Sequence, residues 1–344
     1  MTGKEQILSS FWDLQTSERF CVSSLTSSAD TTTKTGREVR ALEVLLHRRG
    51  WRTRTSRAES AIVDLGPGSG VKARRIVEAL SDRENDPVTY LPVDVSPYCS
   101  AFALLTVLGV SRGDDHVRTW EALIDPPRPA TPREAMADQR ALARRMALEP
   151  APVAEVRLKR VAIPSRGLRA DFVADADQTL EVVAAHPLRR GRRAVLVLLG
   201  QTIGNCTESE QEQFLRAVAR SMAVDDLLLI DAGLRSDGPA AAEHAQVVTD
   251  AYQREAAAFM DHKASRPGDR FQVEYDRTSH QIQHLFEGPG GDRQHLGHSS
   301  LLDRGGLIDL LDRCGLRSID SVSTNGLEGL GAGPDCTVVL ADRR

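Results

Sequence analysis

The chain has 344 residues, 41% of them hydrophobic, and a formal net charge of −4 at pH 7. That length can bury the core of one large domain or two smaller ones, while the charge excludes the overall basic field typical of nucleic-acid binding. The start lacks a signal-peptide core, and no apolar run reaches about 18 residues, so we expect a cytoplasmic globular protein without a nucleic-acid or membrane partner.

The first chemically informative element is a short apolar strand, Ala61–Leu65, followed by glycines at 66, 68 and 70 and a helical stretch, Lys72–Leu80. Glycines at such a turn let the backbone approach a ligand closely, and the next helix offers unpaired N–H groups. The loop therefore predicts a nucleotide-like ligand. An ordinary glycine-rich turn is the alternative.

Two cofactor classes use such a loop. The dinucleotide fingerprint G-x-G-x-x-G requires a third glycine where this chain has Val71. The spacing G-x-G-x-G, with Asp64 two residues ahead, resembles instead the first motif of class I S-adenosylmethionine (SAM) methyltransferases. The loop favours SAM over a nicotinamide dinucleotide.

The second strand, Val88–Val93, ends at Asp94 and precedes a helix, Ser100–Leu108. A carboxylate at this place can accept both ribose hydroxyls of an adenosyl group. Capping of the next helix is the alternative role for Asp94.

An insertion follows at about residues 111–160. Pro126–Pro132 predicts a stiff linker, and an Arg- and Ala-rich pattern predicts a helix over Arg133–Leu148. The insertion could be a lid over the site, a subunit contact or a surface decoration.

After the insertion, Asp171 and Phe172 stand side by side, where an acid could accept from an adenine amino group and a ring could pack on the base. A strand, Ala194–Leu199, then leads into the loop Gly200–Thr207. In open α/β sheets this edge binds ligands. We assign Gly200 and Thr202 of the loop to the cofactor site.

The remaining pattern alternates strands and helices, which indicates an α/β fold. The other expected elements are helices Ser209–Met222 and Leu301–Cys314, strands Leu227–Asp231 and Cys336–Ala341, and a strand near Gln272–Tyr275 or Ile282–Phe286. The cysteines are Cys21, Cys99, Cys206, Cys314 and Cys336; their scattered spacing predicts neither a metal site nor disulfides.

Four motifs in order carry a family resemblance. They are Val63-Asp-Leu-Gly-Pro-Gly-Ser-Gly-Val-Lys72, Pro92-Val-Asp-Val-Ser96, Ala170-Asp-Phe172 and Leu199-Gly-Gln-Thr-Ile-Gly-Asn205. Over residues 60–110 and 165–344 the chain resembles the histidine-specific N-methyltransferases of ergothioneine biosynthesis, a family that includes dimethylallyltryptophan N-methyltransferases. The resemblance implies a class I SAM-methyltransferase Rossmann-like sheet with a second, smaller substrate-binding lobe.

The resemblance also implies a division of the chain and a set of site residues. Residues 1–55 would be a helical part of the substrate lobe, 56–235 the SAM-binding domain, 236–325 the substrate-binding lobe and 326–344 a return strand. Gly66, Gly68, Gly70 and Lys72 would line the SAM methionine and ribose, Asp94 the ribose, and Asp171 with Phe172 the adenine.

The resemblance places the substrate at Asn205 and Tyr252. Asn205 could equally be a left-handed loop residue, and Tyr252 an aromatic at the edge of the core.

Two departures concern the substrate. Histidine-binding members carry Glu-Val-Ser where this chain has Gly297-His-Ser299, and a tyrosine-rich segment where it has Thr31–Arg37. Losing the acid and a tyrosine makes histidine a poor substrate. Ser299 remains as an expected substrate contact.

Methyl transfer from SAM needs alignment more than covalent help, and an amine acceptor must lose a proton. We expect Tyr252, His298 and Ser299 to do catalytic work, and less strongly His280, His284 or His295. The expected function is SAM-dependent N- or C-methylation of a small amino-acid-derived or indole-type acceptor in specialised metabolism, with a homodimer left open. A catalytically silent SAM-fold protein and an NAD-dependent oxidoreductase are the alternatives.

Overall fold

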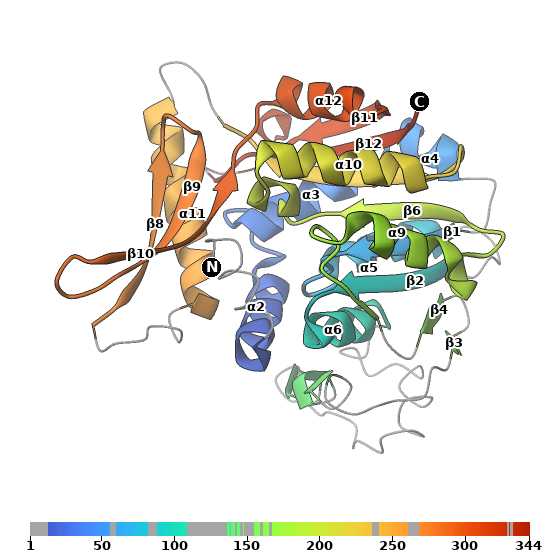
Figure 1. Ribbon diagram of the computed structural model, residues 1–344, viewed down its shortest axis with the longest axis horizontal. Coiled ribbons are helices and arrows are strands. Elements are labelled where there is room, and N and C mark those ends of the chain that lie inside the picture. Colours follow the sequence, from blue (N-terminus) through green and yellow to red (C-terminus); the bar gives the residue numbers. More distant parts are fainter. Residues whose placement is uncertain are drawn as a thin grey trace.

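The computed structural model describes residues 13–55, 60–81, 88–108, 155–158, 161–164, 167–235, 241–260, 268–328, 330 and 333–344, and some residues between 136 and 147. A large sheet forms the body of the molecule, and a three-stranded sheet lies to one side of it (Figure 1). Within the described residues, no helix combines the length and apolar character needed to cross a membrane.

The large sheet has the order β11-β12-β7-β6-β1-β2-β4-β3, with β5 also paired to β2. Neighbours from β6 to β2 are parallel, and β12 runs antiparallel between β7 and β11. Its strands are β1 (Ser60–Leu65), β2 (Val88–Asp94), β3 (Glu155–Leu158), β4 (Val161–Pro164), β5 (Leu168–Arg169), β6 (Arg193–Leu198), β7 (Leu227–Gly233), β11 (Leu316–Ser323) and β12 (Cys336–Arg343).

Helices cover both faces of this sheet. Alternate residues of β1 show the division: Val63 and Leu65 pack into one core cluster with α9, α10 and α12, and Ile62 packs into another with α3, α5 and α6. The helices are α3 (Lys34–His47), α4 (Arg49–Thr55), α5 (Val71–Ser81), α6 (Pro97–Leu108), α9 (Ala176–Ala185), α10 (Glu208–Ser221) and α12 (Arg304–Arg313). Burial of both faces explains the nearly continuous apolar runs of the central strands.

The loop before α10 ends in a reciprocal cap. The Thr207 side chain accepts from the Glu210 backbone N–H, and the Glu210 carboxylate accepts from the Thr207 backbone N–H. This capping box satisfies two backbone donors and fixes where α10 begins. The loop that precedes it is thereby held at the carboxyl edge of β6.

The second lobe consists of α11 (Ala241–Met260) and the antiparallel sheet of β8 (Arg270–Asp276), β9 (Gln281–Glu287) and β10 (Arg293–Ser300). Its own apolar cluster includes Val248, Phe271, Ile282 and Phe286. Both candidate strand segments of this region are strands, so the expectation of only one of them was wrong.

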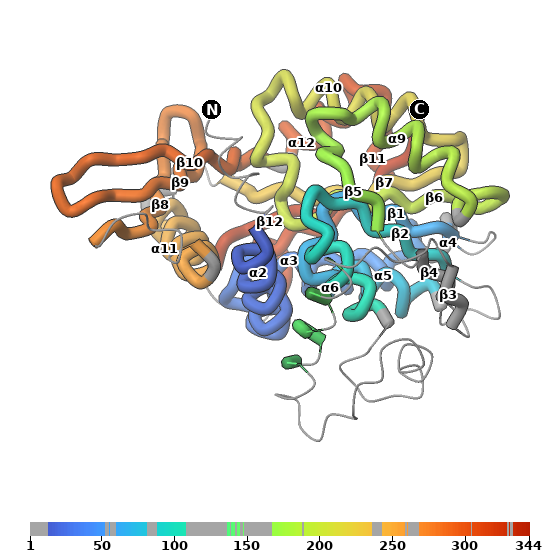
Figure 2. The backbone as a smooth tube through the Cα atoms, turned by 60° about the horizontal axis from the view of Figure 1, so that its bottom comes forward, coloured from blue at the N-terminus to red at the C-terminus, as the bar shows by residue number. Residues whose placement is uncertain are grey.

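Helix α2 (Leu14–Ser27) lies between the two lobes, against α11 on one side and α6 on the other (Figure 2). Asp13 caps its first turn by accepting from the backbone N–H groups of Gln15 and Thr16. The expected linker Pro126–Pro132 and the first residues of the expected helix lie outside the described residues. Those described between 136 and 147 are helical.

Candidate functional site

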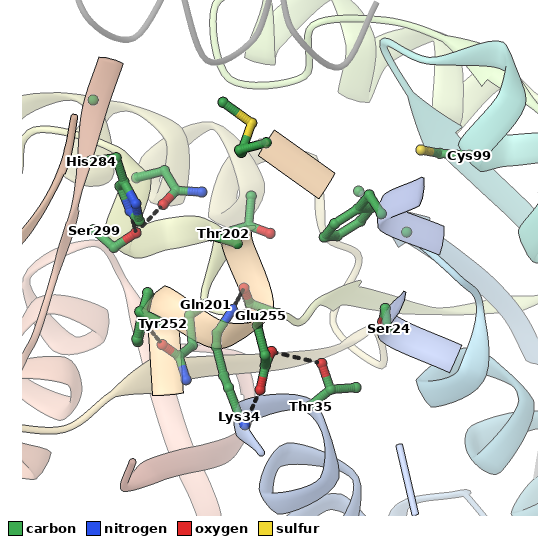
Figure 3. A pocket seen from close by; sticks show the side chains of 18 of the residues that line it. Ser24, Lys34, Thr35, Cys99, Gln201, Thr202, Tyr252, Glu255, His284 and Ser299 are labelled. Atoms are coloured by element: carbon green, nitrogen blue, oxygen red, sulfur yellow. Dashed lines mark hydrogen bonds between the residues drawn. The ribbon is translucent and has the colours of Figure 1, made fainter. Parts of the chain in front are cut away.

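One cavity touches both lobes and gathers most of the residues expected from the sequence (Figure 3). Its lining comes from the carboxyl edge of the large sheet, from α2 and α3, and from α11, β9 and β10. The expected residues that line it are Gly66, Gly68, Lys72, Asp94, Asp171, Phe172, Gly200, Thr202, Asn205, Tyr252, His298 and Ser299. Asp64 and Gly70 are not among the lining residues.

The three glycines of the first loop have different neighbours, although all three have positive φ angles of 73°, 54° and 73°. A Cβ at Gly66 would lie 3.2 Å from the Phe172 ring, and one at Gly68 would lie 3.0 Å from the Phe20 ring. A Cβ at Gly70 would instead lie 2.6 Å from the Ala103 backbone. Gly66 and Gly68 therefore shape the cavity, whereas Gly70 lets α5 and α6 pack closely.

Asp94 ends β2 at the cavity, and its Oδ1 accepts the Ser96 backbone N–H at 2.8 Å. Burial, and next the charge of Asp64, raise the pKa of Asp94 to about 7. The carboxylate thus stabilises the turn after β2 and still faces the cavity, so its two expected roles are compatible.

Asp64 lies behind the loop rather than in the cavity. The Tyr90 hydroxyl donates to its Oδ2 at 2.9 Å, and burial raises the pKa of Asp64 to about 7. Asp64 therefore lies outside the lining, and its charge acts on Asp94.

Asp171 and Phe172 follow β5 and reach the cavity together. Oδ1 of Asp171 accepts the backbone N–H groups of Val173 at 3.2 Å and Ala174 at 3.0 Å, which holds the turn and leaves Oδ2 for a ligand. The Phe172 ring packs edge-on against Phe214 at 6.0 Å between centroids. The pair is rigid enough to serve as a base-binding wall.

The Gly200 loop is tied to the sheet by Asp231 of β7. Its carboxylate accepts the backbone N–H of Gly200 at 3.0 Å and of Gln201 at 2.7 Å. Gln201 has a left-handed backbone, with φ of 58°, and its side-chain oxygen accepts the Tyr252 hydroxyl. The loop thereby joins the large sheet to α11 of the second lobe.

A cluster of buried charged side chains lines the cavity. The sequence did not reveal that these side chains lie together. Glu38 of α3 accepts from Lys72 Nζ at 2.6 Å and lies 3.6 Å from Lys34 Nζ. Lys34 Nζ also donates to the Gly200 carbonyl at 3.0 Å. Burial would raise the pKa of Glu38, but Lys72 and Lys34 together bring it below its ordinary value. Lys72 therefore faces an acid from the N-terminal helices.

Glu255 of α11 closes this cluster from the second lobe. It accepts the Lys34 backbone N–H and lies 3.5 Å from the Thr35 hydroxyl, so it sits at the N-terminus of α3 (Figure 3). A carboxylate there is favoured by the helix dipole. Burial raises the pKa of Glu255, and the Lys34 charge opposes that shift.

A hydrogen-bonded chain forms the far end of the cavity. The Ser299 hydroxyl donates to Asn205 Oδ1 at 2.8 Å and lies 3.2 Å from His284 Nε2. Burial, with smaller contributions from Lys34, His298 and His295, lowers the pKa of His284 to about 3, so its imidazole is neutral at pH 7. The Phe271 ring stacks on it at 6.1 Å.

The other candidate histidines divide between the cavity and the surface of the small sheet. His298 lines the cavity beside Ser299. His280 lies at a turn, 2.9 Å from the Tyr275 hydroxyl, and His295 is exposed beside Gln283; neither belongs to the lining.

Comparison with known families decides what this arrangement is for. Residues 148–287 match the model of the histidine-specific, SAM-dependent methyltransferase family. The protein is a SAM-dependent methyltransferase. The match includes the third and fourth of the four motifs, confirms the family resemblance that they predict, and supports SAM as the cofactor.

Solved structures give weaker likenesses to this methyltransferase. A mitomycin 7-O-methyltransferase is 16% identical with a TM-score of 0.38; the match covers 90% of this chain and only 55% of that one. A sugar N-methyltransferase from Streptoalloteichus is 16% identical with a TM-score of 0.40, covering 93% of this chain and 92% of that one. No curated protein matches the sequence. The fold assignment rests on the strand order of the large sheet instead.

The cavity of the methyltransferase fits SAM at the sheet edge. Gly66 and Gly68 hold the backbone open where side chains would fill the space, and Asp94 and Asp171 present carboxylates to it. These are acceptors of the kind that ribose hydroxyls and an adenine amino group require.

Proposed function

We propose that the methyltransferase methylates a small amino-acid-derived or indole-type acceptor in specialised metabolism, at nitrogen or at carbon. The observation that carries this proposal is the single cavity running from Gly66 and Asp94 to Asn205 and Ser299. A cofactor at the glycine loop and an acceptor at the second lobe would then share one continuous cavity, as direct methyl transfer requires.

The end of the cavity at the second lobe, where we place the methyl acceptor, combines an apolar wall with a few polar groups. Phe271, Leu296 and Met260 supply the wall, and Asn205 with Ser299 supply polar atoms. Such a mixture suits a small ring or side chain with one or two polar substituents.

The segment that binds histidine in the family has a different sequence in this chain. Gly297 leaves no carboxylate at that position, and the nearby His284 is neutral. An imidazole would therefore lack a charged partner at Gly297, which supports a substrate other than histidine.

SAM supplies a methyl group on a sulfonium that is already an activated leaving group. The chain's own residues align the acceptor, exclude water and remove its proton. Tyr252 suits alignment better than proton removal, because its hydroxyl is bonded to Gln201 and burial raises its pKa well above the ordinary value. His298, which also lines the cavity, is the candidate that we propose for removing the proton.

Isothermal titration with S-adenosylhomocysteine, followed by methyl-transfer assays on a panel of amines, amino acids and indoles, tests the proposal. We expect binding of S-adenosylhomocysteine and turnover of at least one amino-acid-derived or indole acceptor, with none for histidine. Binding without transfer to any member of the panel would support the silent SAM-fold alternative. Efficient methylation of histidine would refute the substrate proposal.

A further inference from the structure

Helix α2 covers the glycine loop on the side of the cofactor. The Cys21 thiol donates to the Gly68 carbonyl at 3.4 Å, and the hydroxyls of Ser24 and Ser69 are hydrogen-bonded at 3.0 Å. Phe20 packs so closely that a Cβ on Gly68 would lie 3.0 Å from its ring. Together these contacts make α2 a wall of the SAM end of the cavity.

The same helix also reaches the turn that follows Asp94. Ser17 Oγ lies 2.8 Å from Ser96 Oγ, and both side chains are buried. Any displacement of α2 would therefore disturb two parts of the cofactor site, the glycine loop and the ribose end.

Glu18 on α2 carries a buried carboxylate held by two arginines. Glu18 as a whole is only 2% exposed to solvent. Arg140 Nε donates to Oε1, and Arg144 donates to Oε2, with its Nε at 2.7 Å. Each of the two carboxylate oxygens thus has a charge-assisted hydrogen bond, and both arginines come from the insertion.

The insertion is in turn anchored to α6. Gln139 Nε2 donates to Thr106 Oγ1 at 2.9 Å, and Ala143 is fully buried in the cluster that contains Cys21 and Phe102. Figure 2 shows these described residues next to α2 and α6. The insertion therefore holds α2 from the part of α6 around Phe102 and Thr106, which does not line the cavity.

A buried carboxylate that loses its partners must take up a proton or move toward water. Glu18 can do the latter only if α2 moves. The two arginine side chains are 45% and 50% exposed, so salt in solution can weaken their pairing with Glu18. The position of α2 should consequently depend on ionic strength.

We propose that Glu18, Arg140 and Arg144 form a clasp through which the insertion holds α2 over bound SAM. Glu18 is then a positioning residue for cofactor binding, and the insertion controls how long the cofactor stays. The proposal rests on the SAM dependence of the enzyme and not on the identity of its acceptor.

The test compares S-adenosylhomocysteine affinity and release in wild type and in the double variant Arg140→Ala, Arg144→Ala. We expect the Kd to rise at least tenfold, chiefly through faster release in stopped-flow displacement. The matched control is Arg220→Ala, which removes an exposed ion pair to Asp177 and should leave both quantities unchanged. For wild type, release should also accelerate between 50 and 500 mM NaCl.

A triple variant, Glu18→Met, Arg140→Met, Arg144→Met, provides the second measurement and remains informative if the double variant does not fold. It replaces the ion pairs by apolar contacts, so release should stay slow and lose its salt dependence. The clasp alone would be overturned if the wild type released S-adenosylhomocysteine at a rate independent of salt, or if a folded double variant bound it as the wild type does. Failure of wild type to bind S-adenosylhomocysteine at any salt concentration would refute both the clasp and the proposed function.

Discussion

The Ser299 hydroxyl donates to Asn205 Oδ1 at 2.8 Å while His284 Nε2 lies 3.2 Å from the same oxygen. Because the Ser299 hydroxyl donates its proton to Asn205, the neutral His284 imidazole donates its own N–H to the Ser299 oxygen. These two hydrogen bonds hold Asn205 Oδ1 toward Ser299, so the amide NH2 group remains as a donor for a ligand. A serine and a histidine of the small sheet thereby set the polarity of a loop from the large sheet.

Removing that serine should disturb the acceptor more than the cofactor. In Ser299→Ala the Asn205 amide can turn over, and we expect the KM for the acceptor found in the panel to rise about fivefold, which corresponds to the loss of about 1 kcal/mol of hydrogen bonding. The S-adenosylhomocysteine Kd should stay within twofold, by isothermal titration. Ser299→Thr, which retains the hydroxyl, is the control; equal losses in both variants would contradict this role.

Alanine at Gly66 and at Gly70 should have separable effects. Both positions have φ of 73°, which costs a non-glycine residue roughly 1–3 kcal/mol. At Gly70 the new Cβ also meets the Ala103 backbone, so Gly70→Ala should lower the thermal midpoint more strongly. Gly66→Ala should chiefly weaken S-adenosylhomocysteine binding, because the nearest group is the Phe172 ring, which lines the cavity. Calorimetry and titration on both variants measure the two effects, and a reversed order would refute the assignment.

Cofactor affinity should rise with pH around neutrality. Asp94 has a pKa of about 7 in the free protein and accepts ribose hydroxyls best when ionised. Its ionised fraction therefore rises about tenfold between pH 6 and pH 8, and we expect the Kd of S-adenosylhomocysteine to fall by a similar factor. Asp94→Asn should abolish this dependence.

Asp64→Asn provides a contrasting case for the same titration. Removing the Asp64 charge lowers the pKa of Asp94, so the binding midpoint should move to lower pH. Asp64 itself has a raised pKa, which means that the folded state holds its proton more firmly than the unfolded chain. The burial of Asp64 therefore lowers the free energy of unfolding as the pH rises from about 4 to 7. In urea denaturation, the free energy of unfolding of Asp64→Asn should fall less over this pH range. An unmoved binding midpoint would contradict the coupling.

Glu38 should be important for stability as well as for the site. Its carboxylate is almost inaccessible and faces both Lys34 and Lys72, so Glu38→Gln removes the charge that lies nearest to both ammonium groups. Because Glu255 and Asp231 remain near these ammonium groups, we expect a loss of about 2–3 kcal/mol in the free energy of unfolding, by urea denaturation. Glu43→Gln, which removes a more exposed partner of Arg75, should cost less than about 1 kcal/mol. Similar losses in the two variants would show that the buried cluster has no special weight.

The sequence predicted what depends on local pattern. Strand β1 and its glycine loop could be predicted because a strand that is buried on both faces is an uninterrupted apolar run, and this one ends in glycines. Strands β10 and β11 were not predicted, because many of their residues are polar and only partly buried. Their pairing partners, rather than their own composition, make them strands.

The residues that reach the cavity from the edge of the large sheet were likewise easier to predict than those that reach it from helices. Asp94 and Asn205 follow strands of a sheet whose edge can be anticipated. Glu38 and Glu255 reach the cavity from helices that the folded chain brings together, and nothing near them in the sequence marks them. The signal that could have found Glu38 is its place one turn after Lys34, on a helix that starts at Thr33.

Strand β12 lies between β7 and β11, so the latest element of the chain fills an internal place in the large sheet. During synthesis, residues 227–233 must wait with one edge unpaired until residues 336–343 leave the ribosome. Since Asp231 of that strand holds the Gly200 loop, the site can acquire its final shape only after residues 336–343 have been synthesised. Until then, the unpaired edge of β7 can pair with a strand of another chain.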